Sequence, residues 1–264
     1  MQASPKRHAA HRLRTETRPI GSYEYIQSVI DRLRIVKDSA TYLEMESASG
    51  VHTTLLCRYV TGAIRPSKEQ AVLLERTVLG RSAFKERLRE RIVFGDGGYL
   101  DLHQLVGDPS ALRWISSDVA SQFEDLKCDR VLTAASSGIA LATAVAMQFH
   151  VPIVYATDSK SSGAGPYHEA DLHSQNPSEI STLYIPSMLL RRGDSVIIVD
   201  DVATSGRTMS GLIEIVKKAG CNLEGIFVLV SRSKVWKERI VHSMRPKDVR
   251  ISVYFDIDNE GRRR

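Results

Sequence analysis

The chain has 264 residues, 42% of them hydrophobic and 25% charged, a length that holds one large domain or two smaller ones. No apolar run approaches the roughly 18 residues that a membrane-spanning helix needs, and the basic start lacks the apolar core of a signal peptide. We therefore expect a cytoplasmic protein without membrane contact. The three cysteines form no CxxC pair, which predicts reduced thiols rather than disulfides or zinc ligands.

Positive charge is concentrated in the N-terminal third of the chain. Residues 1–95 contain 17 Lys and Arg against 10 Asp and Glu, whereas residues 96–264 contain 19 against 21. A basic segment joined to a nearly neutral one indicates an anionic partner, of which nucleic acid is the common case. A solvated face with a basic tail is the alternative interpretation of the same pattern.

The N-terminal segments predict a tail followed by short helices. Residues 1–20 lack apolar periodicity and are rich in Arg, Lys and His, which predicts a mobile basic tail. Apolar residues recur at helical spacing within 23–36, and Gly50 separates two further short helical patterns. Residues 21–80 therefore have the spacing of a helix-turn-helix domain.

The segment TTLLCRYVTG, from Thr53 to Gly62, resembles the helix-turn-helix of the lambda-repressor type. The following RPSKEQA is similar to archaeal proteins that join this module to a phosphoribosyltransferase. In such modules the second helix enters the major groove of double-stranded DNA. The resemblance implies base contacts at His52, Thr53, Thr54 and Arg58, and phosphate contacts at Thr41 and Arg65. A helical dimerisation or hood domain that never touches DNA is the alternative.

Residues 81–96 predict a charged amphipathic linker helix, after which a second domain spans 97–259 and a basic tail spans 260–264. The segment from Cys128 to Thr157 contains a strand, a small-residue loop, an Ala-rich helix and a second strand. This βαβ order predicts a doubly wound, mainly parallel α/β sheet. The loop residues are small enough for a diphosphate to approach their backbone: Ala134, Ala135, Ser136, Ser137 and Gly138.

The segment 158–179 is rich in Gly, Ser and Pro and nearly free of aliphatic residues, which predicts a lid loop. Lys160, His168 and His173 are its candidate functional side chains. Further strands are predicted at 225–230 and 249–255, with an edge or hood element at 182–190. Phe255, Asp256 and Asp258 stand at or just after the end of the last predicted strand and are candidates for the border of a base pocket.

The stretch VIIVDDVATSGRTM, Val196 to Met209, combines four aliphatic residues, two carboxylates and a loop of small hydroxylated residues. The aliphatic run predicts a strand that is buried on both faces, with Asp200 and Asp201 at its carboxyl end, where α/β sheets bind ligands. Helical spacing from Met209 to Ala219 places the hydroxyl loop at a helix N-terminus, which favours a phosphate. Carboxylates beside a phosphate site suit sugar hydroxyls or Mg²⁺, so the pattern indicates a ribose phosphate.

At these residues the chain resembles the type I phosphoribosyltransferases, whose signature for 5-phosphoribosyl 1-pyrophosphate has two acids before a Thr/Gly-rich loop. The resemblance implies that Asp200 and Asp201 bind the ribose hydroxyls and that Mg²⁺ accompanies the ligand, with these two carboxylates as possible metal contacts. It implies that the 5′-phosphate is bound by the following loop: Ala203, Thr204, Ser205, Gly206, Arg207 and Thr208. Arg207 stands where relatives commonly have Gly. The resemblance also places pyrophosphate at the loop 134–138.

Two functions follow from these resemblances. In the first, a transcriptional regulator binds 5-phosphoribosyl 1-pyrophosphate or a nucleoside monophosphate as effector and double-stranded DNA through the helix-turn-helix. In the second, the chain is a purine or orotate phosphoribosyltransferase, with Lys160 and Asp201 as catalytic residues. Both imply a homodimer built on the sheet domain. The basic helix-turn-helix favours the regulator, and so does the segment before the lid, where Lys160 alone remains of the lysine and arginine pattern of orotate enzymes.

Overall fold

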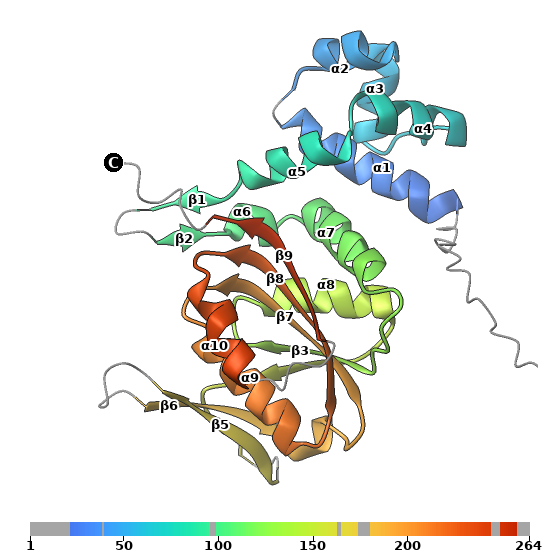
Figure 1. The fold of residues 1–264 in the computed structure, drawn as a ribbon. Helices are drawn as coiled ribbons and strands as arrows, with labels where there is room; N and C mark the ends of the chain where they lie inside the picture. The colour runs from blue at the N-terminus through green and yellow to red at the C-terminus, as the bar shows by residue number, and fades with distance from the viewer. Residues whose placement is uncertain are drawn as a thin grey trace, which may run out of the picture.

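The structure is a computed structural model that describes residues 22–38, 40–95, 99–162, 165–173, 180–243 and 249–257. The predicted basic tails and Asp258 lie outside these described residues. Helices α1 to α5 form a helical region, and an α/β region is built on a central sheet (Figure 1). No helix in the described parts of the chain has the length and apolar character needed to cross a membrane.

The helical region contains α1 (Ser22–Lys37), α2 (Tyr42–Ser49), α3 (Thr53–Val60), α4 (Lys68–Thr77) and α5 (Arg81–Arg89). Strands β1 (Val93–Phe94) and β2 (Leu100–Asp101) connect it to the α/β region. There follow α6 (His103–Val106), α7 (Pro109–Gln122), β3 (Arg130–Ala134), α8 (Ile139–Phe149), β4 (Ile153–Ala156), β5 (Tyr167–His173), β6 (Ile180–Pro186) and the 3₁₀ helix η2 (Ser187–Leu189). The chain continues with β7 (Ser195–Ala203), α9 (Arg207–Lys218), β8 (Asn222–Ser231), α10 (Val235–Ser243) and β9 (Arg250–Asp256).

Helices α2 and α3 form the predicted helix-turn-helix, and local contacts set their ends. Thr41 caps α2 in a reciprocal capping box with Glu44, and such an N-cap contributes about 0.5–2 kcal/mol to stability. Gly50 ends α2 in the left-handed conformation with a φ of 71°, which favours glycine and turns the chain sharply toward α3. The prediction of an all-α N-terminal region is confirmed.

Helix α1 carries the apolar face on which the helical region is assembled. Val29, Leu33 and Val36 are almost fully buried at helical spacing, and α1 packs against α3, α4 and α5. The same helix packs against α7, so that one apolar cluster continues from the helical region to the sheet. Apolar burial therefore joins the two regions.

Helix α5 is shorter than the predicted linker helix. It ends at Arg89, and Val93–Phe94 form β1, which pairs with β2 instead of extending the helix to residue 96. Phe84 and Leu88 are buried in the cluster shared by the two regions. The helix is therefore part of the core, because its few apolar residues all fall on one face.

The α/β region is built on a five-stranded parallel sheet of order β4-β3-β7-β8-β9. Helices α7 and α8 cover one face, and α9 and α10 cover the other (Figure 1). In β7, Ile197 and Val199 belong to the first apolar cluster, whereas Val196 and Ile198 belong to the second. This two-sided burial is what the aliphatic run predicted, and the doubly wound fold is confirmed.

The strand order of the sheet reverses between β3 and β7. From β3 the chain proceeds outward to β4, and it returns on the other side of β3 as β7 before continuing to β8 and β9. Loops at such a switch point run in opposite directions and leave a crevice at the carboxyl ends of the strands. The loop after β3 and the acid pair of β7 therefore border one crevice.

The segment predicted as a long lid loop contains one strand of an antiparallel hairpin. Strand β5 pairs with β6 from Tyr167 and Pro186 to His173 and Ile180. Of the predicted lid, 163–164 and 174–179 lie outside the described residues. The buried face of β5 offers little more than Ala170 and Leu172, which pack on α9, and this is too few apolar residues to reveal a strand.

A glycine in β8 provides a test of the packing between α7 and the sheet. A Cβ at Gly225 would lie 2.7 Å from Cε1 of the buried Phe123 ring. We expect Gly225→Ala to lower the free energy of unfolding by about 1–3 kcal/mol in urea denaturation, because a filled core resists added volume. Adding Phe123→Leu should make room, so that the double variant is more stable than the sum of the two single losses predicts. If the stability losses of the two single variants simply add in the double variant, the contact between position 225 and Phe123 is contradicted.

Candidate functional site

The two predicted carboxylates lie at the carboxyl end of β7 and are buried. Asp200 is 7% exposed and Asp201 is 5% exposed. The Asp201 Oδ1 atom accepts hydrogen bonds from Ser137 Oγ at 3.1 Å and from the Val202 amide at 2.9 Å. The Asp201 amide donates to Asp200 Oδ1 at 3.1 Å. Ser137 belongs to the small-residue loop after β3, so the two predicted motifs meet at one site.

Burial sets the electrostatics of this acid pair. It raises the pKa of Asp200 well above the usual range of that carboxyl, and the neighbouring charge of Asp201 raises the pKa further. A carboxylate removed from water gains from any partner that supplies hydrogen-bond donors or positive charge. Sugar hydroxyls and a divalent cation are such partners.

The loop 134–138 lies directly against the acid pair. A Cβ at Gly138 would lie 2.3 Å from Thr133 Oγ1 and 3.6 Å from Asp200 Oδ1, so only glycine fits where this loop enters α8. Ala135, Ser136 and Ser137 are exposed, while Ala134 is buried. An exposed turn of small residues leaves its backbone open to an anion at this edge of the sheet.

The hydroxyl loop after β7 is shaped by Gly206. Its φ is 75°, and a Cβ there would lie 2.8 Å from the Trp236 Cα atom, so the loop requires glycine for two reasons. Helix α9 begins at Arg207 without a side-chain cap, which leaves N–H groups of its first turn open to an anion. Thr204 and Ser205 are exposed beside it, Thr208 is half-buried, and Ala203 is buried in the last position of β7.

Arg207, where relatives commonly have Gly, lies beside a separate cavity of about 320 Å³. Asp171 of the hairpin and Arg239 of α10 line the same cavity, on the outer side of α9. This cavity gives the side chain at position 207 space outside the loop 204–206. The departure from the family pattern is compatible with a phosphate site.

Trp236 is a site residue that the sequence did not reveal. It is fully buried in the first turn of α10, and its Nε1 donates to Ser231 Oγ at 3.0 Å. Its backbone and Cβ form the surface on which Gly206 packs. Since 30 residues separate Trp236 from the loop, only the packing of α10 on α9 brings it there.

Lys160 lies at the base of the hairpin. Its Nζ is 3.2 Å from Glu169 Oε2 and 4.9 Å from the centre of the Tyr184 ring. His168 is half-buried in β5, and the side chain of His173 lies outside the described part of the structure. Lys160 is therefore held by the hairpin, and a role at the acid pair requires it to leave Glu169.

The predicted border of the base pocket needs a correction. Strand β9 extends to Asp256, so that Phe255 and Asp256 lie within the strand rather than after it. Phe255 is 4% exposed and packs edge-on against Tyr254, 4.9 Å between ring centres, which makes it a core residue. Asp256 is exposed, with its Oδ2 3.8 Å from the Lys237 Nζ.

The residues predicted to contact DNA are spread over α3 and its neighbouring segments, with three of them at the start of the helix. His52 is the exposed N-cap, and its Nδ1 accepts a hydrogen bond from the Thr54 amide at 3.3 Å. Thr54 and Arg58 are exposed, while Thr53 is half-buried and its amide donates to Glu46 Oε2 at 2.8 Å. Thr41 is exposed, with its hydroxyl engaged in capping α2. Arg65 is exposed and lies over the Tyr23 ring, 4.2 Å from its centre.

Comparison with known proteins agrees with this geometry. Residues 111–256 match the model of the phosphoribosyl transferase domain. The chain belongs to the phosphoribosyl transferase family. The chain also shares its fold with adenine phosphoribosyltransferase from Thermoanaerobacter pseudethanolicus, with a TM-score of 0.56 and 18% identity over 65% of this chain and 99% of the other.

Two relatives extend the comparison in different directions. The purine biosynthesis transcriptional repressor PurR of Bacillus subtilis is 30% identical over 217 residues, 81% of this chain and 72% of that protein. A xanthine phosphoribosyltransferase of Heliobacterium modesticaldum is 31% identical over 130 residues, 49% of this chain and 68% of that enzyme. The match with the repressor is longer than the family domain, so it reaches beyond residues 111–256.

The donor set at the acid pair suits Mg²⁺ that arrives with a ligand. Carboxylate oxygens are preferred ligands of Mg²⁺, which usually retains several waters or substrate oxygens. Within the described ranges, no three His, Cys, Asp or Glu side chains gather closely enough to hold a metal ion. Asp200 and Asp201 therefore fit Mg²⁺ when a diphosphate supplies further oxygens.

The raised pKa of Asp200 makes stability depend on pH. The folded protein binds this proton more tightly than the unfolded chain, so stability falls as the pH rises from the ordinary Asp value through the raised pKa. We expect ligand-free Asp200→Asn to lose less stability over this window and to melt above wild type at neutral pH. Thermal unfolding at a series of pH values measures both effects.

Asp129→Asn is the matched control for this experiment. The Ser195 amide and the Lys127 ammonium lower the pKa of Asp129, so this carboxylate stabilises the fold above the ordinary Asp value and loses that effect in acid. Its replacement should lower the melting temperature at neutral pH. If the wild-type protein melts above Asp200→Asn at neutral pH, the inference that the buried acid pair costs stability is contradicted.

Proposed function

We propose that the protein is a DNA-binding transcriptional regulator whose phosphoribosyl transferase domain binds 5-phosphoribosyl 1-pyrophosphate or a nucleoside monophosphate as effector. The observation that supports this proposal is that one chain combines short N-terminal helices in helix-turn-helix order with a buried acid pair against which the small-residue loop packs. Support comes from the relative that is named a repressor of purine biosynthesis, because its similarity reaches beyond the phosphoribosyl transferase domain.

The effector is bound by three groups of residues. Asp200 and Asp201 accept hydrogen bonds from the ribose hydroxyls, which relieves the burial of these carboxylates. The loop 204–208 and the first turn of α9 bind the 5′-phosphate, and the loop 134–138 binds the diphosphate through its backbone. Mg²⁺, when bound with the diphosphate, neutralises part of its charge. The closeness of Gly138 to Asp200 supports this arrangement.

Double-stranded DNA is bound by the helical region. Helix α3 enters the major groove with its N-terminal end, where His52, Thr53 and Thr54 lie, and Arg58 in its last turn also reaches the bases, while Thr41 and Arg65 contact the phosphates. The exposure of Thr54 and Arg58 supports this placement, as does the basic charge of the N-terminal third. The Thr41 hydroxyl already takes part in the N-cap of α2, so it is less suited than Arg65 to contact a DNA phosphate.

A homodimer would present two such helices. Helix-turn-helix proteins bind half-sites about one helical turn apart as dimers, so a second copy of this chain is the partner that DNA binding demands. Three large apolar side chains at the β4 side of the sheet support this interface: Met147 on α8 is 69% exposed, Tyr155 on β4 47%, and Met188 on η2 77%. Sedimentation of the purified protein measures this association.

The second candidate is an active nucleobase phosphoribosyltransferase, with Lys160 and Asp201 as its catalytic residues. The similarity to xanthine phosphoribosyltransferases supports it, because an effector site and a catalytic site need the same contacts to the sugar diphosphate. The pairing of Lys160 with Glu169 favours the regulator. Release of pyrophosphate in the presence of a panel of bases distinguishes the two functions.

Binding of the effector depends on the acid pair. We expect the double substitution Asp200→Asn with Asp201→Asn to abolish binding of 5-phosphoribosyl 1-pyrophosphate with Mg²⁺, because both carboxylate charges are lost. Calorimetry measures the affinity. Asp125→Asn is the control, since this carboxylate pairs with Arg250 at the start of β9, at the opposite end of the sheet. Wild-type affinity in the double variant would overturn the assignment of the site.

DNA binding should depend on Arg58 and on salt. Each phosphate neutralised contributes a slope of about −0.9 to the dependence of log affinity on log salt concentration. We expect Arg58→Ala to cost about 1–3 kcal/mol of operator affinity if its guanidinium contacts a guanine edge. Selection from random duplexes supplies the operator, and fluorescence anisotropy measures the affinity. If the selection enriches no sequence, the regulator loses its main support.

A further inference from the structure

Helix α1 carries two adjacent charged residues that are buried against the α/β region. Asp31 and Arg32 are each 2% exposed. Two adjacent residues of α7 face them: Arg113 Nε lies 2.6 Å from Asp31 Oδ2, and the Arg32 guanidinium carbon lies 4.4 Å from the centre of the Trp114 ring. The contact between the two regions therefore contains charged groups beside the shared apolar cluster.

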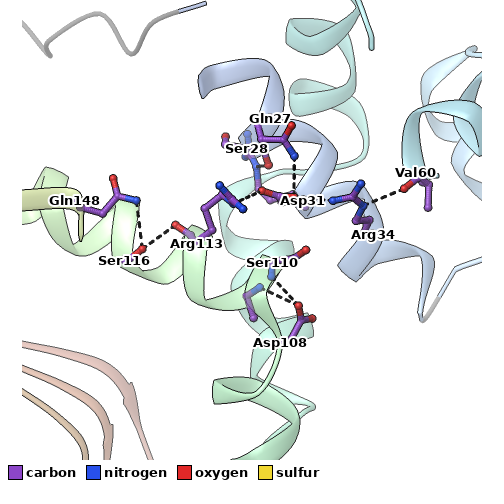
Figure 2. A network of polar contacts seen from close by, with 12 residues as sticks. Gln27, Ser28, Asp31, Arg34, Val60, Asp108, Ser110, Arg113, Ser116 and Gln148 are labelled. Atoms are coloured by element: carbon purple, nitrogen blue, oxygen red, sulfur yellow. Dashed lines mark hydrogen bonds and ion pairs between the residues drawn. The ribbon is translucent and has the colours of Figure 1, made fainter. Parts of the chain in front are cut away.

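The Asp31 carboxylate also faces the DNA-binding motif. Its Oδ1 atom lies 3.0 Å from Arg34 Nη1, and Arg34 Nε donates to the Val60 carbonyl oxygen at 2.9 Å. Val60 is the last residue of α3, the helix predicted to read DNA. Figure 2 shows Arg113 and Arg34 on either side of Asp31, so that one carboxylate joins α7 to the end of α3.

On the other side, the contacts continue to α8. Ser116 Oγ of α7 donates to the Arg113 carbonyl oxygen at 3.1 Å, and Gln148 Nε2 near the C-terminal end of α8 donates to Ser116 Oγ at 3.4 Å (Figure 2). At its other end, α8 begins directly after Gly138, the residue that packs against Asp200. Polar contacts thus run from the C-terminal end of α8 through α7 and α1 to α3, and the helix α8 itself joins them to the small-residue loop.

Asp31 is the buried member of its two ion pairs. Its side chain is 3% exposed, whereas the side chains of Arg113 and Arg34 are 54% and 40% exposed. The desolvation of the Asp31 carboxylate offsets attraction to partners that stay in water, so these contacts are a poor means of stabilising an interface. Their geometry does define the position of neighbouring elements, and switching proteins use ion pairs in this way. The Asp31 charge on α1 is thus better explained by positioning than by stability.

We propose that Asp31 is a positioning residue that sets the position of α3 according to the state of the ligand site, a role that rests on the function proposed above. A diphosphate at the loop 134–138 acts on the start of α8, and α7 moves with α8 through their shared packing. This movement shortens or lengthens the contact between Arg113 and Asp31. The displacement of Asp31 then shifts Arg34, which is bonded to the end of α3. Ligand and DNA influence each other because each favours one of the two arrangements.

The experiment measures operator affinity with and without saturating 5-phosphoribosyl 1-pyrophosphate and Mg²⁺. We expect a ratio of about 5- to 150-fold in wild type, the usual range of such coupling. Asp31→Asn, Arg113→Gln and Arg34→Gln should each bring the ratio close to one, whichever way they change affinity itself. Lys127→Gln is the control, because it removes an exposed ion pair with Asp129 away from this contact and should keep the wild-type ratio.

Combined substitutions separate positioning from a general loss of stability. If the contacts act in series, Arg113→Gln together with Arg34→Gln loses no more coupling than either change alone, whereas independent structural effects would add. All of these variants should bind the sugar diphosphate as wild type does, since none of them touches the candidate ligand site. Calorimetry checks this requirement.

Trp114 provides a readout that does not need DNA. The chain has two tryptophans, so the part of a ligand-induced fluorescence shift that Trp114→Phe removes reports on the contact of Trp114 with Arg32. Adding the ligand to wild type should produce this shift, and Asp31→Asn should abolish it while calorimetry still detects binding.

A wild-type ratio and a retained fluorescence shift in the Asp31, Arg113 and Arg34 variants would overturn the role of Asp31 and leave the proposed function intact. A wild-type protein in which ligand and DNA bind independently would overturn the proposed function, and the role of Asp31 with it.

Discussion

The burial of two adjacent carboxylates at the end of β7 is the constraint on which the rest of the α/β region depends. Like charges side by side in a core repel each other, so the chain must supply donors to them and leave a position for a further partner. The Ser137 hydroxyl and the Val202 amide supply donors to Asp201. The Val202 amide belongs to β7 itself, whereas the Ser137 hydroxyl is available because β3 lies beside β7 and its loop turns toward the acids.

The glycines around the site follow from the same constraint. Gly138 lets the loop after β3 approach Asp200, and Gly206 lets the next loop pack against the backbone of Trp236. Without ligand, this arrangement costs stability, because both carboxyl groups are buried and desolvation raises the pKa of Asp200. A ligand that satisfies the carboxylates recovers this cost and so stabilises the folded state. Such a site responds strongly to occupancy, which suits an effector site as well as an enzyme.

Local patterns predicted those parts of the structure that are specified by neighbours in the chain. The aliphatic run of β7 and the glycine between α2 and α3 are of this kind, as is the start of α9 after the hydroxyl loop. Three features could not be predicted because they depend on contacts between distant segments. Strand β5 is fixed by its packing on α9, Trp236 reaches Gly206 through α10, and Phe255 is enclosed by Tyr254 and the shared core.

The charged residues of α1 illustrate the same limit most clearly. In the sequence, Asp31 and Arg32 resemble the solvated face of an amphipathic helix, since charged residues are buried only when they are paired. Their partners come from α7 and α4, because Arg32 also pairs with Glu75 at 2.7 Å. Helix α1 therefore combines the apolar packing of the shared cluster with charged contacts to α7, α4 and the end of α3.

This combination has a mechanical consequence. The apolar contacts keep α1, α3 and α4 together, whereas the charged contacts depend on the exact distance between their partners. Shifts of about 1–2 Å at a helix contact are enough to change the state of many switching proteins. Under the proposed function, a displacement of that size at the end of α3 would move the side chains that we assign to the base edges. A charged contact between the helical and the α/β region is therefore an arrangement that a small ligand could influence.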